Sequence, residues 1–215
     1  MVLDIQENSL RILDGCNDPR PDGDWGDTNH QGLVYGMVQS GKTASMISLV
    51  SQAQKAGYRL FVVLAGDKSS LRDQTQDRFS KSFGLDNGVN STKMIYSPTW
   101  SSDFKQTGRG YSENFRDFQR VAGQDWTIVI VIKKNVFLLE RLIADLEGLR
   151  QWCQSQPENR NFDFSEDYKC MIIDDEADYA SQDTDTQGDG SAVHGKLVTL
   201  REISGFRNCY VAYTA

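Results

Sequence analysis

The apolar residues of this chain gather in short continuous runs, separated by longer amphipathic stretches. Continuous apolar runs are typical of strands that helices cover on both faces. The amphipathic stretches carry apolar residues at helical spacing, as Leu139, Leu142 and Leu146 illustrate. Alternating strands and helices predict a parallel sheet with right-handed crossovers. We expect strands over residues 33–38, 59–65, 93–96, 127–132, 169–174 and 207–214, and helices over 44–56, 69–82, 135–152 and 192–203.

The remaining segments are polar or irregular in pattern. Residues 1–31 are expected to form an irregular N-terminal lead-in, because Asp, Gly, Pro and Asn are frequent from residue 14 onward. Residues 97–125 are less regular, and residues 154–167 read as a polar loop. The chain has 215 residues, so residues 32–215 are long enough for one large domain with its own core. We predict a three-layer α/β/α domain with a mostly parallel sheet.

Residues 36–43 read Gly-Met-Val-Gln-Ser-Gly-Lys-Thr and fit the G-x-x-x-x-G-K-[ST] pattern of a phosphate loop. Glycines let such a backbone curl around phosphates, and its N–H groups and the following helix start face the anion. The lysine reaches the outer phosphates, and the threonine hydroxyl ligates Mg²⁺. A predicted strand precedes the motif and a predicted helix follows it, as the motif requires. The residues expected to bind a nucleotide are Gln39, Ser40, Gly41, Lys42, Thr43 and Ala44.

A second candidate element of the site is an apolar strand that ends in acids, Cys-Met-Ile-Ile-Asp-Asp-Glu over residues 170–176. Ligands bind at the carboxyl ends of strands in such sheets. A strand-end Asp can hold Mg²⁺, and a neighbouring Glu can orient and deprotonate water. We assign the metal role to Asp175, with Thr43, and the water-activating role to Glu176; Asp174 as the metal ligand is the competing register. The acidic pair favours hydrolysis of a nucleoside triphosphate over phosphoryl transfer to a metabolite.

Composition limits the other functional classes. Net charge is −7, which argues against a free-standing protein that binds nucleic acid through a basic face. Four dispersed cysteines and two histidines give no cluster with zinc-ligand spacing. No apolar run approaches the roughly 20 residues needed to cross a bilayer, and the N-terminus has no signal core. We expect a cytoplasmic protein without a membrane partner.

Several blocks, in the same order along the chain, resemble the Z1-domain family. The phosphate-loop block covers residues 32–43, and the next covers Ala56-Gly57-Tyr58-Arg59 with residues 63–66. Later blocks are residues 71–78, residues 173–181 and the terminal Tyr213-Thr214-Ala215. Members of this family are large bacterial proteins assigned as endonucleases and linked to restriction and phage defence. The family is similar in turn to superfamily 2 helicases, which have a RecA-like ATPase core.

The resemblance implies roles for further residues. It implies ATP as the nucleotide, together with Mg²⁺. Gln74, Thr75 and Gln76 correspond to a nucleic-acid contact motif of helicases, although a polar helix face explains them equally well. Lys133 and Lys134 follow a strand where helicases touch a nucleic-acid backbone, although a solvated strand end is an equal alternative. Thr214 resembles part of the motif that couples hydrolysis to movement.

Residues 175–178 spell Asp-Glu-Ala-Asp, but the phosphate loop differs from that of DEAD-box RNA helicases and their Pro-Thr-Arg-Glu-Leu motif is missing. The resemblance also implies that the chain ends where a first RecA-like domain ends. We therefore expect a truncated protein that lacks the second RecA-like domain with its arginine finger. The fragment alone is then expected to hydrolyse ATP poorly.

The sequence thus predicts the Mg²⁺-dependent ATPase domain of a helicase-like DNA motor in a bacterial restriction or phage-defence protein. The partners implied by the resemblance are DNA, through the full-length protein, the second domain, and a nuclease or defence protein. The alternative is an ATP-dependent switch that controls a partner or nuclease without translocation. A fold that only binds nucleotide is disfavoured by the intact Lys42-Thr43 and Asp175-Glu176 pairs.

Overall fold

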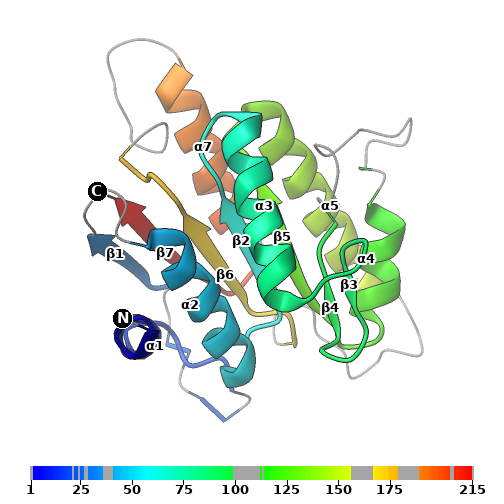
Figure 1. Cartoon of the computed structure of the whole chain (residues 1–215). Helices are drawn as coiled ribbons and strands as arrows, with labels where there is room; N and C mark the ends of the chain where they lie inside the picture. Colours follow the sequence, from blue (N-terminus) through cyan, green and yellow to red (C-terminus); the bar gives the residue numbers. More distant parts are fainter. Residues whose placement is uncertain are drawn as a thin grey trace.

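The computed structural model describes residues 2–20, 22–23, 25–26, 29–35, 41–98, 112, 114–155, 167–178, 189–203 and 206–214. Within these ranges the chain forms a seven-stranded sheet in the order β1-β7-β6-β2-β5-β4-β3 (Figure 1). Neighbouring strands pair in parallel, except that β3 and β4 are antiparallel. The strands are β1 (Gln31–Tyr35), β2 (Leu60–Leu64), β3 (Val89–Asn90), β4 (Ile95–Tyr96), β5 (Thr127–Ile132), β6 (Cys170–Asp174) and β7 (Asn208–Thr214).

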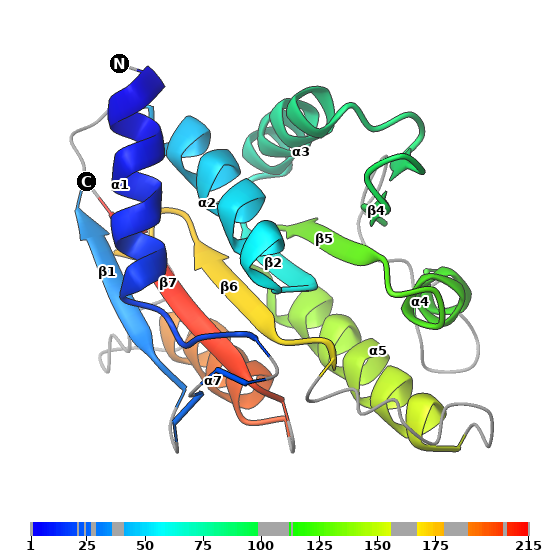
Figure 2. The ribbon, with the colours of Figure 1, turned by 90° about the horizontal axis from the view of Figure 1, so that it is seen from below.

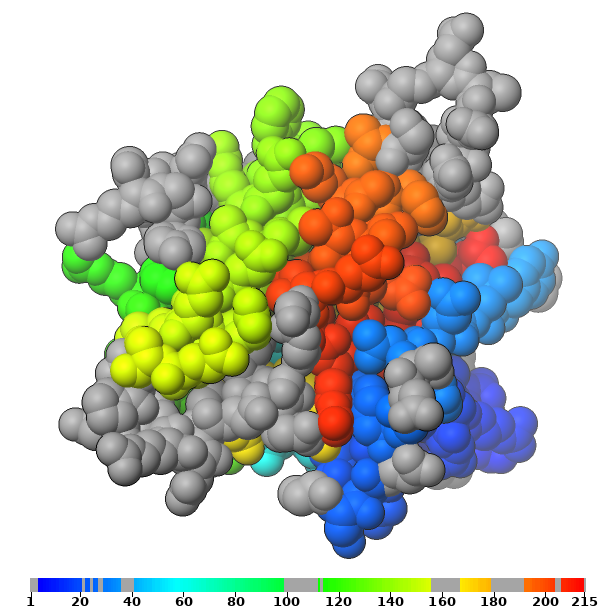
Figure 3. All heavy atoms as spheres, turned by 180° about the vertical axis from the view of Figure 1, so that it is seen from behind, coloured from blue at the N-terminus to red at the C-terminus, as the bar shows by residue number. Residues whose placement is uncertain are grey.

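Helices cover both faces of the sheet and make the fold a three-layer α/β/α sandwich (Figure 2). One outer layer contains α1 (Val2–Asp14), α2 (Lys42–Ala56) and α3 (Ser69–Phe83). The other contains α4 (Phe115–Ala122), α5 (Val136–Ser155) and α7 (Asp189–Arg201). Figure 3 shows the molecule from the side of the second layer, where α5 and α7 lie next to each other on the same face of the sheet.

The central strands are buried on both faces because successive side chains point to opposite sides of a sheet. In β2, Phe61 and Val63 face the layer of α1, α2 and α3, whereas Leu60, Val62 and Leu64 face the layer of α5. The strands β5 and β6 share this alternation of two apolar sides. The continuous apolar runs in the sequence therefore encode strands between two helical layers, and the predicted fold class is confirmed.

Two segments differ from the expectations. Residues 2–14, part of the expected irregular lead-in, form helix α1. Ile5, Ser9 and Ile12 recur at helical spacing, and Ser9 is fully buried with its hydroxyl bonded to the carbonyl of Ile5 at 2.7 Å. The Gly, Pro and Asp signals that suggested irregularity begin only near residue 14. Helix α4 likewise lies inside the stretch expected to be less regular, where its eight residues bury Phe118 and Val121.

Parallel pairing places the carboxyl ends of the neighbouring strands at one edge of the sheet. Asp174, the last residue of β6, is in register with Leu64 at the end of β2 and with Ala212 near the end of β7. In the same way Tyr35, the last residue of β1, is in register with Thr214. The fold thus brings the strand-end residues of four segments together.

Candidate active site

The start of α2 follows β1 and lies at this edge of the sheet. Gly41 precedes the helix in the left-handed region, with φ 81° and ψ 25°, a conformation that glycine adopts without steric cost. The first N–H groups of a helix have no partner inside it, and they carry the positive end of its dipole. Lys42, Thr43 and Ala44 occupy this first turn and so offer donors to an anion. The predicted ligands Gln39 and Ser40 lie outside the described residues.

Three consecutive acids at the end of β6 have different surroundings. Asp174 is fully buried, accepts a hydrogen bond from the Tyr210 hydroxyl and forms an ion pair with Lys134 at 2.6 Å. Asp175 and Glu176 are partly buried and follow in a turn. Asp174 is therefore engaged with the interior, whereas the next two acids are available to a ligand at the surface.

A cavity of about 680 Å³ lies between the start of α2, the acidic turn and α3. This size is within the range of roughly 300–1,000 Å³ that is typical of small-molecule sites. The structure brings the predicted catalytic residues and the described phosphate-loop residues together around one space. The residues that line it are Gly41, Lys42, Thr43, Ala44, Ile47, Arg78, Lys81, Ser82, Asp175 and Glu176.

The carboxylate of Asp175 has the features of a metal ligand. Its Oδ1 atom is buried and has no hydrogen-bond partner among the described residues. Burial raises the pKa of Asp175, and the charge of Glu176 raises it further, while the charge of Lys42 opposes the shift. A buried carboxylate oxygen without a partner is costly, and a hard divalent cation with oxygen ligands would satisfy it. Because the Thr43 hydroxyl lines the same cavity, Thr43 and Asp175 fit Mg²⁺.

The backbone of the acidic turn is held in an unusual conformation. Glu176 has φ 55°, in the left-handed region that costs a residue with a side chain about 1–2 kcal/mol. Lys134 Nζ donates to the Glu176 carbonyl at 2.7 Å, and the Ala177 N–H donates to the Tyr213 carbonyl at 2.8 Å. On the other side, the Asp175 N–H donates to the Leu64 carbonyl at 3.0 Å. These contacts fix the turn that carries both surface acids, and strain of this kind is found at functional sites.

The candidate nucleic-acid residues on α3 divide into a surface and an interior set. Gln74 is exposed and, with the buried Thr75, lines a small cavity of about 80 Å³ beside Glu176. Gln76 is buried and its amide donates to the Ser97 hydroxyl at 3.0 Å. Gln74 is thus the member of this trio whose side chain faces solvent.

The two candidate lysines after β5 also differ. Lys133 donates to the Ser69 hydroxyl at 3.0 Å in an exposed contact. Lys134 is buried, with its ammonium directed to Asp174 and to the Glu176 carbonyl. Thr214, the candidate coupling residue, ends β7 at the same sheet edge. Lys134 therefore supports the acidic turn, and the assignment of nucleic-acid contacts to this set remains a prediction.

Arg78 is a site residue that the sequence analysis did not single out. Its guanidinium donates to Thr43 Oγ1 at 2.9 Å, which places a cation directly at the expected magnesium ligand. Arg78 also lines both cavities next to the acidic turn. The sequence pattern that could have identified Arg78 is its spacing, because Gln74, Arg78 and Lys81 recur along one face of α3.

The fold, the phosphate-loop sequence before α2 and the strand-end acids together define a domain of the P-loop NTPase fold class. No family model matches the chain, and no curated protein matches it. Among solved structures, the chain is similar to the pCW3 conjugation coupling protein TcpA in its monomer form with ATPgS, with a TM-score of 0.38, 14% identity, and coverage of 87% of this chain and 43% of that one. It is also similar to the signal recognition particle receptor FtsY from Elizabethkingia anophelis in complex with GDP, with a TM-score of 0.30, 16% identity, and coverage of 96% and 64%. The chain thus spans less than two thirds of either matched protein.

Proposed function

We propose that this domain binds and hydrolyses ATP with Mg²⁺ in the cavity between α2, α3 and the acidic turn. The observation that carries the proposal is the Asp175 carboxylate, with one buried oxygen that no described residue satisfies, in the same cavity as Lys42 and Thr43. A buried carboxylate oxygen without a hydrogen-bond partner is unfavourable unless a ligand completes it. A phosphate-bound divalent cation does so, and the adjoining helix start offers donors to the phosphates.

Each residue has a distinct part in this proposal. The Lys42 ammonium and the backbone N–H groups at the start of α2 hold the phosphates. Thr43 and Asp175 would hold Mg²⁺, which when bound neutralises charge on the phosphate oxygens. Glu176 accepts a proton from the attacking water and orients it, because its carboxylate lines the cavity beside Asp175. Arg78, whose guanidinium donates to Thr43 Oγ1 at 2.9 Å, would be placed to contact a phosphate oxygen beside Thr43.

We also propose that the domain is the first RecA-like unit of a DNA motor in a bacterial restriction or phage-defence protein. The support is the resemblance of its sequence blocks to the Z1-domain family, together with the position of Gln74 and Thr75 beside the acidic turn. A contact between bound DNA and α3 would then act directly on Asp175 and Glu176. A second RecA-like domain, a cytoplasmic location and a nuclease or defence partner belong to the same proposal. No helix in the described part of the chain has the length and apolar character needed to cross a bilayer.

The test is an ATPase assay on the longer protein that contains this domain, with and without DNA, beside the Lys42→Ala and Glu176→Gln variants. We expect DNA to increase the rate several-fold. Glu176→Gln removes the proposed general base and is expected to lower the rate of hydrolysis by about 10²–10⁴-fold. Lys55→Met, at an exposed position in the last turn of α2 and outside the large cavity, is the matched control for the loss of a lysine and should retain hydrolysis.

The outcomes separate the candidate functions. Hydrolysis that ignores DNA but responds to a protein partner would support a nucleotide-controlled switch and overturn the motor. Equal rates in the unmodified protein and in Glu176→Gln would overturn the catalytic assignment.

A further inference from the structure

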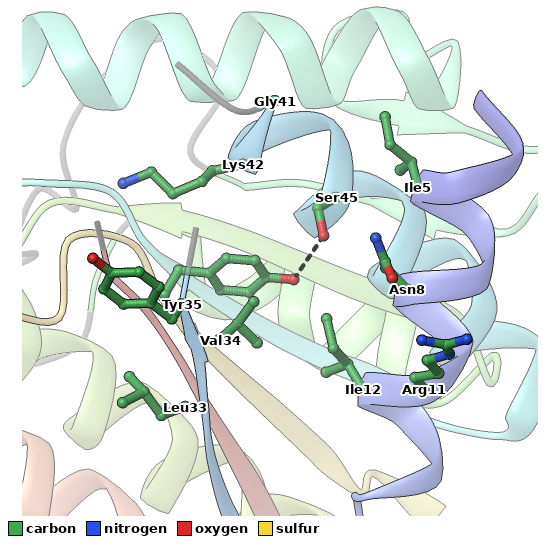
Figure 4. A pocket seen from close by; sticks show the side chains of 11 residues that line it. Ile5, Asn8, Arg11, Ile12, Leu33, Val34, Tyr35, Gly41, Lys42 and Ser45 are labelled. Atoms are coloured by element: carbon green, nitrogen blue, oxygen red, sulfur yellow. Dashed lines mark hydrogen bonds between the residues drawn. The ribbon is translucent and has the colours of Figure 1, made fainter. Parts of the chain in front are cut away.

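A second cavity, of about 480 Å³, lies on the other side of the start of α2 from the acidic turn, between α1, β1 and α2 (Figure 4). Its lining combines apolar side chains from α1 and β1, such as Ile5, Ile12 and Val34, with a few polar groups. In Figure 4, Ile5, Asn8 and Ile12 project from α1 toward the space beside Ser45 and Val34. Apolar side chains together with convergent polar groups are typical of sites that bind small organic ligands.

This cavity adjoins the proposed phosphate site. Gly41 and Lys42 line both cavities, so the start of α2 lies between a compartment that holds both acids and one whose lining mixes aliphatic and aromatic side chains with polar groups such as Asn8 and Arg11. The first compartment holds Arg78, Asp175 and Glu176. A nucleoside triphosphate would span the two compartments, because a flat base with a few hydrogen-bonding groups follows a chain of anionic phosphates. With the phosphates at the start of α2 and their outer end toward Glu176, the nucleoside extends into the second cavity.

The polar groups of the second cavity favour one base. The Asn8 side chain offers a donor and an acceptor on one short amide, which matches the N7 acceptor and the N6 amino donor of adenine. Arg11 would suit guanine O6 and N7 instead, but its guanidinium is bonded to Glu7 at 2.6 Å. Asn8 is thus a polar group on α1 that is placed to discriminate between purines, and the comparison of ATP with GTP distinguishes it from Arg11.

The rest of the cavity is held in shape by packing. Ser9, next to Asn8, is fully buried and its hydroxyl contacts the carbonyls of Ile5 and Ser45, which fixes α1 against α2. Ser45 and Tyr213 both line the cavity, and their hydroxyls are hydrogen-bonded at 3.2 Å; the dashed line at Ser45 in Figure 4 marks this bond. Helix α1 therefore presents Asn8 from a rigid support.

We propose that the cavity between α1, β1 and α2 binds the base of the nucleotide, and that Asn8 selects adenine. This proposal rests on the proposed ATPase function, and it assigns base recognition to a segment that precedes the phosphate loop. Helix α1 is then part of the active site, not a lead-in to it.

The experiment measures binding of Mg–ATP, Mg–GTP and Mg–tripolyphosphate to the purified chain by calorimetry. Tripolyphosphate reports the phosphate site alone, since it has no base. The variants are Asn8→Ala, Lys42→Ala and, as a matched control, Gln6→Ala, an exposed residue of α1 that does not line the cavity. Thermal unfolding of each variant confirms that α1 remains packed.

We expect Asn8→Ala to weaken ATP binding on the order of 10-fold, as for loss of one good bidentate contact to a base, and to remove the preference for ATP over GTP. Binding of tripolyphosphate should stay within about twofold, and Gln6→Ala should behave as the unmodified chain. If Lys42→Ala weakens ATP and tripolyphosphate but Asn8→Ala binds ATP as tightly as the unmodified chain, the base assignment is wrong and the proposed function stands. If the unmodified chain binds neither ligand, both are wrong.

Discussion

Lys134 Nζ lies 2.6 Å from Asp174 Oδ1, and both side chains are fully excluded from solvent. Asp174 ends β6 and Lys134 follows β5, and β2 lies between these two strands in the sheet. The same ammonium donates to the Glu176 carbonyl at 2.7 Å. The pair therefore links the interior of the sheet to the turn that carries the surface acids, and several predictions about stability and activity depend on it.

Loss of the lysine should destabilise the fold strongly. In Lys134→Met the Asp174 carboxylate is left buried without its cation, which costs about 3–5 kcal/mol in unfolding free energy. Denaturant unfolding measures this cost. The control Lys133→Met removes an exposed contact to Ser69 and should change stability by less than about 0.5 kcal/mol.

A double variant tests the cause of that loss. Lys134→Met with Asp174→Asn removes both charges, so it should be more stable than Lys134→Met alone. A double variant as unstable as the sum of the two single variants would show that the charges are not coupled, and would contradict the role of the pair.

Asp175 should act in metal binding rather than in folding. Asp175→Asn keeps the size of the side chain but removes the charge that would face Mg²⁺. We expect the affinity for Mg²⁺ in the presence of nucleotide to fall on the order of 10–100-fold. The unfolding free energy should be unchanged or raised, because the buried Oδ1 atom of Asp175 has no hydrogen-bond partner among the described residues. Titration of Mg²⁺ at fixed nucleotide measures the first quantity. A clear fall in the unfolding free energy of Asp175→Asn would show instead that Asp175 is a structural residue.

The conformation of Glu176 predicts a separation of stability from activity. Its φ of 55° suits glycine, so Glu176→Gly should be more stable than Glu176→Ala by about 1 kcal/mol. The Lys134 contact uses only the backbone carbonyl and persists in both variants. Both should lose hydrolysis, because neither has a carboxylate to activate water. Glycine less stable than alanine at this position would contradict the strained turn.

A buried acid outside the site should govern part of the pH dependence of stability. Burial raises the pKa of Asp145, while hydrogen bonds from the Ser112 N–H and hydroxyl partly offset the shift. The folded state then binds the proton more tightly than the unfolded state, so this contribution is complete below the unfolded pKa of about 3.9 and is lost as pH rises through the folded pKa.

Asp145→Asn carries no titrating proton and keeps an oxygen that can accept from the Ser112 N–H. Its unfolding free energy should therefore not show this fall as pH rises above about 4. In the unmodified chain the fall amounts to about 1.4 kcal/mol per unit of pKa shift, and denaturant unfolding at a series of pH values measures it. A variant with the same pH profile as the unmodified chain would contradict the raised pKa.

The sequence was sufficient for elements whose pattern is local. The apolar runs of β2, β5 and β6 are confirmed as strands because burial on both faces leaves a continuous signature. Helix α1 was missed because the Gly, Pro and Asp residues that follow it dominated the interpretation of residues 1–31. The short antiparallel pair β3 and β4 was likewise foreseen only in its second strand.

The site was predictable only in part, for a physical reason. Lys42, Thr43, Asp175 and Glu176 could be named because phosphate chemistry needs those residue types next to a strand end. The role of Lys134 in supporting the turn depends on packing between segments 40 residues apart, as the contact with Asp174 shows, and no local pattern encodes it. The same holds for Asn8, whose relevance appears only when α1 is placed beside β1.

The most direct test of the account is calorimetric binding of Mg–ATP to this chain and to its Lys42→Ala variant. The account predicts a single site in the unmodified chain and a loss of affinity of at least about 10-fold in the variant, since the ammonium contacts the outer phosphates. Equal affinity in the two proteins, or no binding to the unmodified chain, would contradict the claim that the cavity between α2, α3 and the acidic turn is a nucleotide site.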